Sequence, residues 1–186
     1  EALNLILIRN NYGFENIIVF THKENNETLI NFLEGMKITF YTESINKCKN
    51  VLENKNCFLL SIHYRFIIKK EILESFTGRS VNLHPSLLPK YKGLNTHERA
   101  LEAGDTQHGA SVHFVTADLD SGPVIAYSEV PISATDNPSS LESKVLLKEH
   151  ILYPQVIQWF ASGDIIYSLQ GVFLNNQLLT SAGIKL

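Results

Sequence analysis

Two short polar segments carry the side chains best suited to chemistry. The first contains Asn82 and His84, two residues apart at the end of an apolar run, followed by a loop with Pro85 and Pro89. Residues two apart in extended backbone point to the same face, so the amide and the imidazole are expected to lie side by side. The second segment surrounds Asp120 and also follows an apolar run. The question for function is whether the two segments meet.

Asn82, His84 and Asp120, if they converge, suit the transfer of an acyl group to a bound amine. Asn82 offers two amide N–H donors, which can stabilise an oxyanion that develops on a carbonyl. His84 can move a proton near neutral pH or, when charged, support the same oxyanion. Asp120 beside it would favour the imidazolium or accept a proton through water. Such a set needs no Ser or Cys nucleophile.

Each of these residues also has a simpler interpretation. A histidine before a proline is commonly a structural hydrogen-bonding residue, and the segment around Asp120 by itself is typical of a turn. His113 is interpreted as a strand residue with a local hydrogen bond, and His97 and His108 as surface or loop residues. No metal site is predicted, because the histidines have neither cysteine companions nor zinc-site spacing. The chain also contains no P-loop and no G-x-G-x-x-G motif.

The elements around the first segment alternate between strand and helix patterns. Strands are predicted at 16–20, 37–41, 57–62 and 80–83, and helices at 1–9, 27–34, 44–53 and 69–76. This alternation indicates an α/β fold with a mostly parallel sheet flanked by helices.

The second half of the chain has a different pattern. A helix is predicted at 95–103, two longer alternating strands at 108–116 and 124–130, and short strands around Asn175 and Asn176. Because only a short loop separates the two longer strands, they are expected to form an antiparallel hairpin with Asp120 in its loop. Asn137 and Pro138 are typical of the start of a helix, which is predicted to be long and to end at Gly163.

Composition limits the class of protein. The 186 residues fit a single domain over 1–186, and 44% hydrophobic with 19% charged residues is ordinary for a soluble globular protein. A net charge of −3 does not suggest a nucleic-acid or membrane partner. No apolar run is long enough to cross a bilayer. Two cysteines, Cys48 and Cys57, are too few for a disulfide framework, so a cytoplasmic location is expected.

The residues around both polar segments resemble the phosphoribosylglycinamide formyltransferases of purine biosynthesis, within the folate-dependent formyltransferase superfamily. The similarity covers about residue 57 to the end of the chain. It rests on Asn82 to Tyr91 with Gly93 and Thr96-His97, Gly104-Asp105, His108-Gly109, Ser111 to Thr116, Leu119 to Ile125, Glu149-His150, Tyr153-Pro154 and Trp159-Phe160. The resemblance implies a Rossmann-like formyltransferase fold. It also implies formyl transfer from N10-formyltetrahydrofolate, a donor co-substrate, to the primary amine of glycinamide ribonucleotide.

The resemblance also implies roles for individual residues. Asn82, His84 and Asp120 match the family's catalytic trio, and Asn82 is expected to contact the formyl donor as well. Glu149 matches a glutamate that contacts the ribonucleotide, although its simpler interpretation is an exposed helix position. The family's folate-pocket segment, which holds the pterin largely through backbone groups, falls on Tyr64, Arg65, Phe66 and Ile67.

Two departures from the family pattern leave the acceptor open. The family's first strand and its Ser-Gly-x-Gly-Ser-Asn phosphate loop are not found, and Glu1 falls in the helix that follows them. We therefore expect either a native protein that begins further upstream or a different acceptor. The spacing from Arg65 to Asn82 is one residue longer than expected and resembles formyltransferases that act on amino sugars of nucleotide-sugars. A third hypothesis is a non-catalytic relative that binds folate or a partner. The protein is expected to be a monomer or a homodimer.

Overall fold

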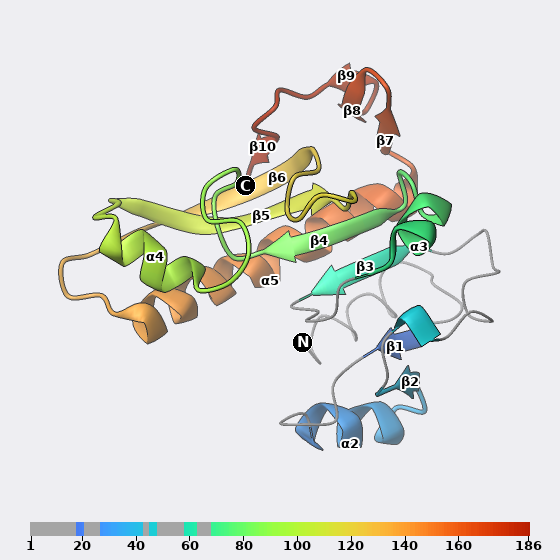
Figure 1. The fold of residues 1–186 in the computed structure, drawn as a ribbon, viewed down its shortest axis with the longest axis horizontal. Coiled ribbons are helices and arrows are strands. Elements are labelled where there is room, and N and C mark those ends of the chain that lie inside the picture. Colours follow the sequence, from blue (N-terminus) through green and yellow to red (C-terminus); the bar gives the residue numbers. More distant parts are fainter. Residues whose placement is uncertain (1–17, 21–26, 43–44, 48–57, 63–67) are drawn as a thin grey trace.

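A five-stranded mixed sheet organises the part of the chain that the structure describes (Figure 1). The structure is a computed structural model, and it describes residues 18–20, 27–42, 45–47, 58–62 and 68–186. The strands of this sheet are β3 (Leu59–Ile62), β4 (Ser80–His84), β5 (Gln107–Phe114), β6 (Val124–Pro131) and β10 (Ile184–Lys185). Their spatial order is β10-β6-β5-β4-β3. The predicted helix at 1–9, both cysteines and the segment 64–67 lie outside the described residues.

The first half of the chain has the predicted alternation of strands and helices. β3 and β4 pair in parallel, with α3 (Lys70–Ser75) between them in the sequence. β1 (Ile18–Phe20) and β2 (Thr39–Tyr41) form a separate parallel pair on either side of α2 (Glu27–Gly35). In the segment 44–53 the described residues form a single 3-10 turn, η1 (Ile45–Lys47). The α/β fold class is confirmed.

The second half adds the predicted antiparallel hairpin. β5 pairs antiparallel with β6 on one side and with β4 on the other. The sheet is therefore parallel at both ends, since β10 pairs in parallel with β6, and antiparallel in the middle. A register irregularity lies between Val112 and His113, just before the hairpin loop. The hairpin places the Asp120 loop beside the end of the sheet.

A long helix covers one face of this sheet. α5 (Pro138–Ser162) runs behind β5 and β6 in Figure 1. It begins as predicted: the side chain of Asn137 accepts a hydrogen bond from the Ser140 N–H, and the Asn137 N–H donates one to the Ser140 hydroxyl. It ends at Gly163, whose φ of 74° is readily adopted by glycine.

The apolar stripe of α5 forms the core with the sheet. Its predicted members are all buried: Leu141, Val145, Leu152, Val156 and Phe160. Val81, Leu83, Val112 and Phe114 of β4 and β5 belong to the same cluster. Each such side chain contributes about 1.5–3 kcal/mol when fully buried, so this face of the sheet stabilises the fold. The polar residues of these strands point to the opposite face of the sheet.

The remaining elements lie at the edges. α4 (Thr96–Glu102) precedes β5, and a small antiparallel sheet follows α5, made of β7 (Ile165–Ser168), β8 (Gly171–Leu174) and β9 (Gln177–Leu178). Asn175 and Asn176, both with positive φ, connect β8 and β9, as the sequence predicts for short strands around them. Within the described ranges, no helix has the length and apolar character needed to span a bilayer.

Candidate active site

The candidate site lies on the face of the sheet opposite the core cluster. Asn82 and His84 alternate with buried Val81 and Leu83 along β4, so both polar side chains point away from α5. The antiparallel register places His113 directly opposite Asn82, and Ser111 directly opposite His84. Residues directly opposite across an antiparallel pair share a face, so four polar side chains gather at one point of the sheet.

Asp120 reaches this group from the hairpin loop. Its Oδ2 lies 3.4 Å from His84 Nδ1, and both side chains are almost fully buried, at 9% and 6% exposure. The structure therefore brings together Asn82, His84 and Asp120, which the sequence places in two separate segments. Their catalytic role stays a prediction.

His113 is a fourth member of the group. Its Nε2 lies 3.2 Å from the Asn82 amide nitrogen and 3.6 Å from Asp120 Oδ1. Its Nδ1 hydrogen-bonds the Phe114 carbonyl at 2.8 Å, which is the local bond predicted for a strand residue. The prediction missed the other two contacts. They depend on the pairing of β4 with β5, and the only signal in the sequence was a histidine on the same hairpin as Asp120.

The hydrogen-bond network assigns the protons on both imidazoles. The carbonyl of Tyr91, 2.9 Å from His84 Nε2, can only accept, so that nitrogen carries a hydrogen. The Phe114 carbonyl likewise requires a hydrogen on Nδ1 of His113. His113 Nε2 is then an acceptor for the Asn82 amide. A neutral His84 would direct a lone pair at Asp120, so the ion pair requires the charged imidazolium.

Asp120 is held as a carboxylate. Burial by itself would raise the pKa of this carboxyl, but the contact with His113, the hydrogen bond from the Gly93 N–H and the nearby His84 imidazole lower the pKa below its usual value. The Gly93 N–H donates to Oδ2 at 2.9 Å. The backbone of Asp120 is left-handed, with φ 46°, a conformation that Asp tolerates better than most residues.

The loop that carries Asp120 lies very close to β5. A Cβ at Gly122 would fall 1.8 Å from the carbonyl oxygen of Phe114, which is shorter than any real contact. Only glycine permits this approach. The same carbonyl accepts the His113 hydrogen bond, so the position of the loop and the orientation of His113 depend on one peptide group.

The loop after β4 is fastened to β5 by serine hydroxyls. Ser111 Oγ donates to the Ser86 carbonyl at 2.7 Å and accepts from the Leu88 N–H at 3.1 Å. Ser86 Oγ donates to the Lys90 carbonyl at 2.7 Å. The Leu88–Pro89 peptide is cis. These bonds close the loop over the end of β4 and bring Tyr91 and Gly93 to the His84–Asp120 pair.

His97 and His108 form a separate pair, which corrects the prediction that they are surface or loop residues: His108 is buried in β5, and His97 is half-buried in α4. His97 Nδ1 and His108 Nε2 lie 3.1 Å apart, and His108 is 1% exposed within β5. Burial, aided by the nearby His97, lowers the pKa of His108 to about 4, so it is neutral at pH 7. The sequence alone could not place His108 next to α4, because that position depends on how the strands pair.

Across the described ranges, no three His, Cys, Asp or Glu side chains are grouped to hold a metal ion.

The predicted substrate contacts can be placed only in part. Glu149 lies on α5 and is 2% exposed, so its simpler interpretation as an exposed helix position is wrong. A carboxylate buried to this degree requires polar or charged partners. Tyr64, Arg65, Phe66 and Ile67 lie outside the described residues.

Residues 14–157 match the family model described as formyl transferase. The chain is 46% identical over 117 residues to phosphoribosylglycinamide formyltransferase of Escherichia coli (strain K12), a match that covers 63% of this chain and 55% of that protein. It is 39% identical over 120 residues to the enzyme of the same name from Haemophilus influenzae, covering 64% and 57%. The matches thus span little more than half the length of these curated relatives.

Similarity in structure extends over more of the chain. A solved structure of phosphoribosylglycinamide formyltransferase from Coxiella burnetii superposes with a TM-score of 0.86 at 33% identity. The superposition covers 99% of this chain and 92% of that one.

Proposed function

The chain belongs to the formyl transferase family, and from this premise we propose that it transfers a formyl group from N10-formyltetrahydrofolate to the primary amine of glycinamide ribonucleotide, in purine biosynthesis. The observation that carries the proposal is the buried contact between His84 and Asp120, with Asn82 on the same face of β4. An amide donor, an imidazolium and a carboxylate are the groups that amine attack on an acyl carbon requires.

The roles of these groups follow from the reaction. The amine nitrogen bonds to the formyl carbon, and the carbonyl electron pair moves to oxygen. An N–H of Asn82 and the charge of His84 stabilise this oxyanion. Collapse re-forms the carbonyl and breaks the bond to the donor nitrogen. One proton must move from the attacking amine to the departing nitrogen, and His84 with Asp120 can carry it. No group of the protein becomes covalently bound.

His113 supports the trio by orienting it. Its Nε2 accepts one N–H of the Asn82 amide, and this fixes the rotation of the amide. Among the described residues the second N–H of that amide has no protein partner, so it is available to a substrate oxygen. Orientation of this kind contributes to catalysis because the donor needs no rearrangement as charge develops.

We assign two further contacts by position in the family pattern. Tyr64, Arg65, Phe66 and Ile67 are proposed to line the folate pocket, and Glu149 to bind the ribonucleotide. A carboxylate such as that of Glu149 can accept hydrogen bonds from the hydroxyl groups of a bound sugar. We also propose one formyltransferase domain over 1–186, a cytoplasmic location, and a monomeric or homodimeric state, which size-exclusion chromatography with light scattering would determine.

The acceptor is tested with a panel of amines. The full-length protein is incubated with N10-formyltetrahydrofolate and, in separate reactions, glycinamide ribonucleotide, an amino sugar of a nucleotide-sugar, and glycinamide alone. Formylated product is measured by mass spectrometry. We expect product from the ribonucleotide, the substrate in the names of the relatives described above. Product from the amino sugar alone would overturn the choice of acceptor. Turnover that His84→Ala and Asp120→Asn leave unchanged would exclude catalysis by the trio.

A further inference from the structure

The loop after β4 contacts both members of the His84–Asp120 pair through its backbone. The Tyr91 carbonyl accepts the Nε2–H of His84 at 2.9 Å, and the Gly93 N–H donates to Asp120 Oδ2 at 2.9 Å. The two contacting groups are only two residues apart. The conformation of this short turn therefore decides which nitrogen of His84 faces Asp120.

Tyr91 adopts a conformation that an L-residue rarely occupies. Its φ is 55°, in the left-handed region, and Gly93 follows with φ 80°. Glycine enters this region freely, but a tyrosine must be held there by its surroundings. The contacts of the Tyr91 side chain therefore help to hold the turn, beside its backbone contacts with His84 and Asp120.

The side chain of Tyr91 is held by two charged residues outside the trio. Its hydroxyl donates to Asp105 Oδ2 at 2.9 Å. The Arg99 guanidinium lies over its ring, 5.3 Å from the centroid, and donates to the carbonyls of Lys92 at 2.7 Å and Leu94 at 3.2 Å. Asp105 lies between α4 and β5 and is the only hydrogen-bond partner of that hydroxyl among the described residues. The Tyr91 ring is thus held at its hydroxyl by Asp105 and across its face by Arg99.

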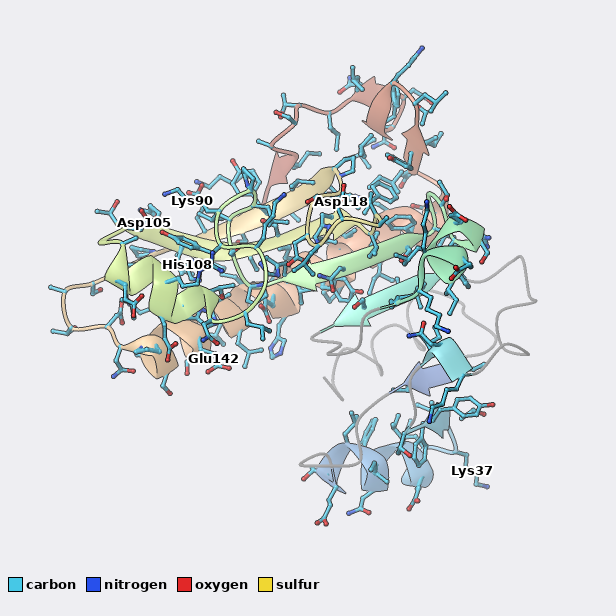
Figure 2. All side chains as sticks on the ribbon, in the orientation of Figure 1. Lys37, Lys90, Asp105, His108, Asp118 and Glu142 are labelled. Atoms are coloured by element: carbon cyan, nitrogen blue, oxygen red, sulfur yellow. The ribbon has the colours of Figure 1, made fainter. Side chains whose placement is uncertain are left out.

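We propose that Asp105 is a positioning residue for the formyl transfer: by binding the Tyr91 hydroxyl, it holds the Tyr91 carbonyl where it accepts the Nε2–H of His84 and leaves Nδ1 facing Asp120. The inference rests on the proposed function, which it deepens. Asp105 acts through Tyr91 and touches none of the reacting atoms. It lines an open surface groove of about 330 Å³ together with Lys90 and His108, and all three are labelled beside α4 in Figure 2.

The neighbouring Lys90 offers a matched control. Its Nζ lies 3.0 and 2.8 Å from the two carboxylate oxygens of Asp105, so it also binds this residue. The Lys90 side chain is 61% exposed, and exposed ion pairs contribute little. Lys90→Gln removes the ion pair but leaves the bond between Asp105 and Tyr91. A role for Asp105 in surface charge alone would make Lys90→Gln and Asp105→Ala equivalent.

The kinetic test compares four single variants of the full-length protein. Tyr91→Phe removes only the hydroxyl, and Asp105→Ala removes its acceptor together with the ion pair to Lys90. We expect kcat to fall about tenfold in both, the effect of losing one orienting hydrogen bond, with KM for the acceptor amine within about twofold. Asp105→Asn keeps an acceptor oxygen and should retain most of kcat, and Lys90→Gln should match the wild type. The double variant Tyr91→Phe/Asp105→Ala should lose no more than either single one.

A spectroscopic readout separates this inference from the proposed function. With ¹⁵N-labelled histidine, long-range ¹H–¹⁵N correlation spectra report which nitrogen of His84 carries hydrogen in the protein alone. We expect both nitrogens to carry hydrogen in the wild type and in Lys90→Gln, with the Nε2–H protected from exchange with water, and faster exchange of that hydrogen in Tyr91→Phe and Asp105→Ala. An unchanged spectrum in those two variants overturns the inference, whatever their activity. A protein that formylates no amine but shows the expected spectra contradicts the proposed function alone.

Discussion

Asn82 and His113 face each other directly across β4 and β5, with the amide nitrogen 3.2 Å from the imidazole Nε2. This contact makes a strand histidine part of the candidate site and gives the Asn82 amide one orientation. It also connects Asn82 to Asp120, because the same nitrogen of His113 lies 3.6 Å from the carboxylate.

Replacing His113 with Phe should reduce both catalysis and stability. The ring shape is kept, but the Asn82 amide loses its acceptor and the Phe114 carbonyl loses its donor. We expect kcat to fall about tenfold or more, and the free energy of unfolding to fall by about 1–3 kcal/mol for the unpaired groups. Steady-state kinetics and urea unfolding measure the two effects. An unchanged kcat in the folded variant would mean that Asn82 needs no orientation by His113.

Replacing Asp120 with Asn should remove the charge that holds His84 as an imidazolium. Proton transfer by a positioned group contributes about 10² to 10⁴ in rate, and we expect Asp120→Asn to lower kcat by about 10² or more. Asp118, labelled in the same hairpin loop in Figure 2, is exposed and offers the matched control. Asp118→Asn should retain full activity. Equal losses in the two variants would point to a general effect on the loop.

The buried His108 should make stability depend on pH. Its pKa is lowered from 6.5 to about 4 in the folded protein, so the unfolded chain binds the additional proton between these values. Stability is therefore fully present above pH 6.5 and is lost as the pH falls toward 4, by an amount on the order of 2–3 kcal/mol from this residue. Urea unfolding at pH 7 and pH 5 should show a smaller difference for His108→Gln than for the wild type. The same pH dependence of stability in both proteins would mean that a titratable group other than His108 causes it.

Adding one methyl group at Gly122 should displace the Asp120 loop. The new Cβ would lie 1.8 Å from the Phe114 carbonyl oxygen, so backbone must move. We expect Gly122→Ala to cost about 1–3 kcal/mol and to reduce kcat, because Asp120 and His113 both depend on that peptide. Gly35, at the end of α2, has nothing within 4 Å of an added Cβ. Gly35→Ala should therefore leave both stability and activity near wild type, as differential scanning fluorimetry and the formylation assay would show.

Truncation of α5 side chains should separate the core face from the solvent face. Leu152 is fully buried against the sheet, whereas Leu147 on the same helix is 68% exposed. We expect Leu152→Ala to cost about 2–5 kcal/mol and Leu147→Ala less than about 0.5 kcal/mol. Urea unfolding measures both. Similar losses would mean that Leu147 is covered in the native protein.

The elements of the fold were predictable because their signals are local. Asn137, Pro138 and Gly163 mark the two ends of α5 by capping chemistry, and the stripe from Leu141 to Phe160 has the helical period. The hairpin followed from two alternating strands with a short loop between them. The amide and imidazole of Asn82 and His84 share a face because strand side chains alternate, which needs no knowledge of the rest of the chain.

Tertiary structure decided which residues the side chains of Asn82 and His84 contact. The register of β4 against β5 places His113 opposite Asn82, and a register shifted by one residue would have moved His113 to the core face. The alternation in the sequence shows which residues of each strand share a face, but which residue of β5 lies opposite Asn82 was decided only when the two strands paired and packed against α5. The same holds for Tyr91, whose carbonyl contacts His84 while its hydroxyl donates to Asp105, fourteen residues later. Residue types and local spacing thus determined the chemistry that was available, and long-range packing determined the geometry in which it is arranged.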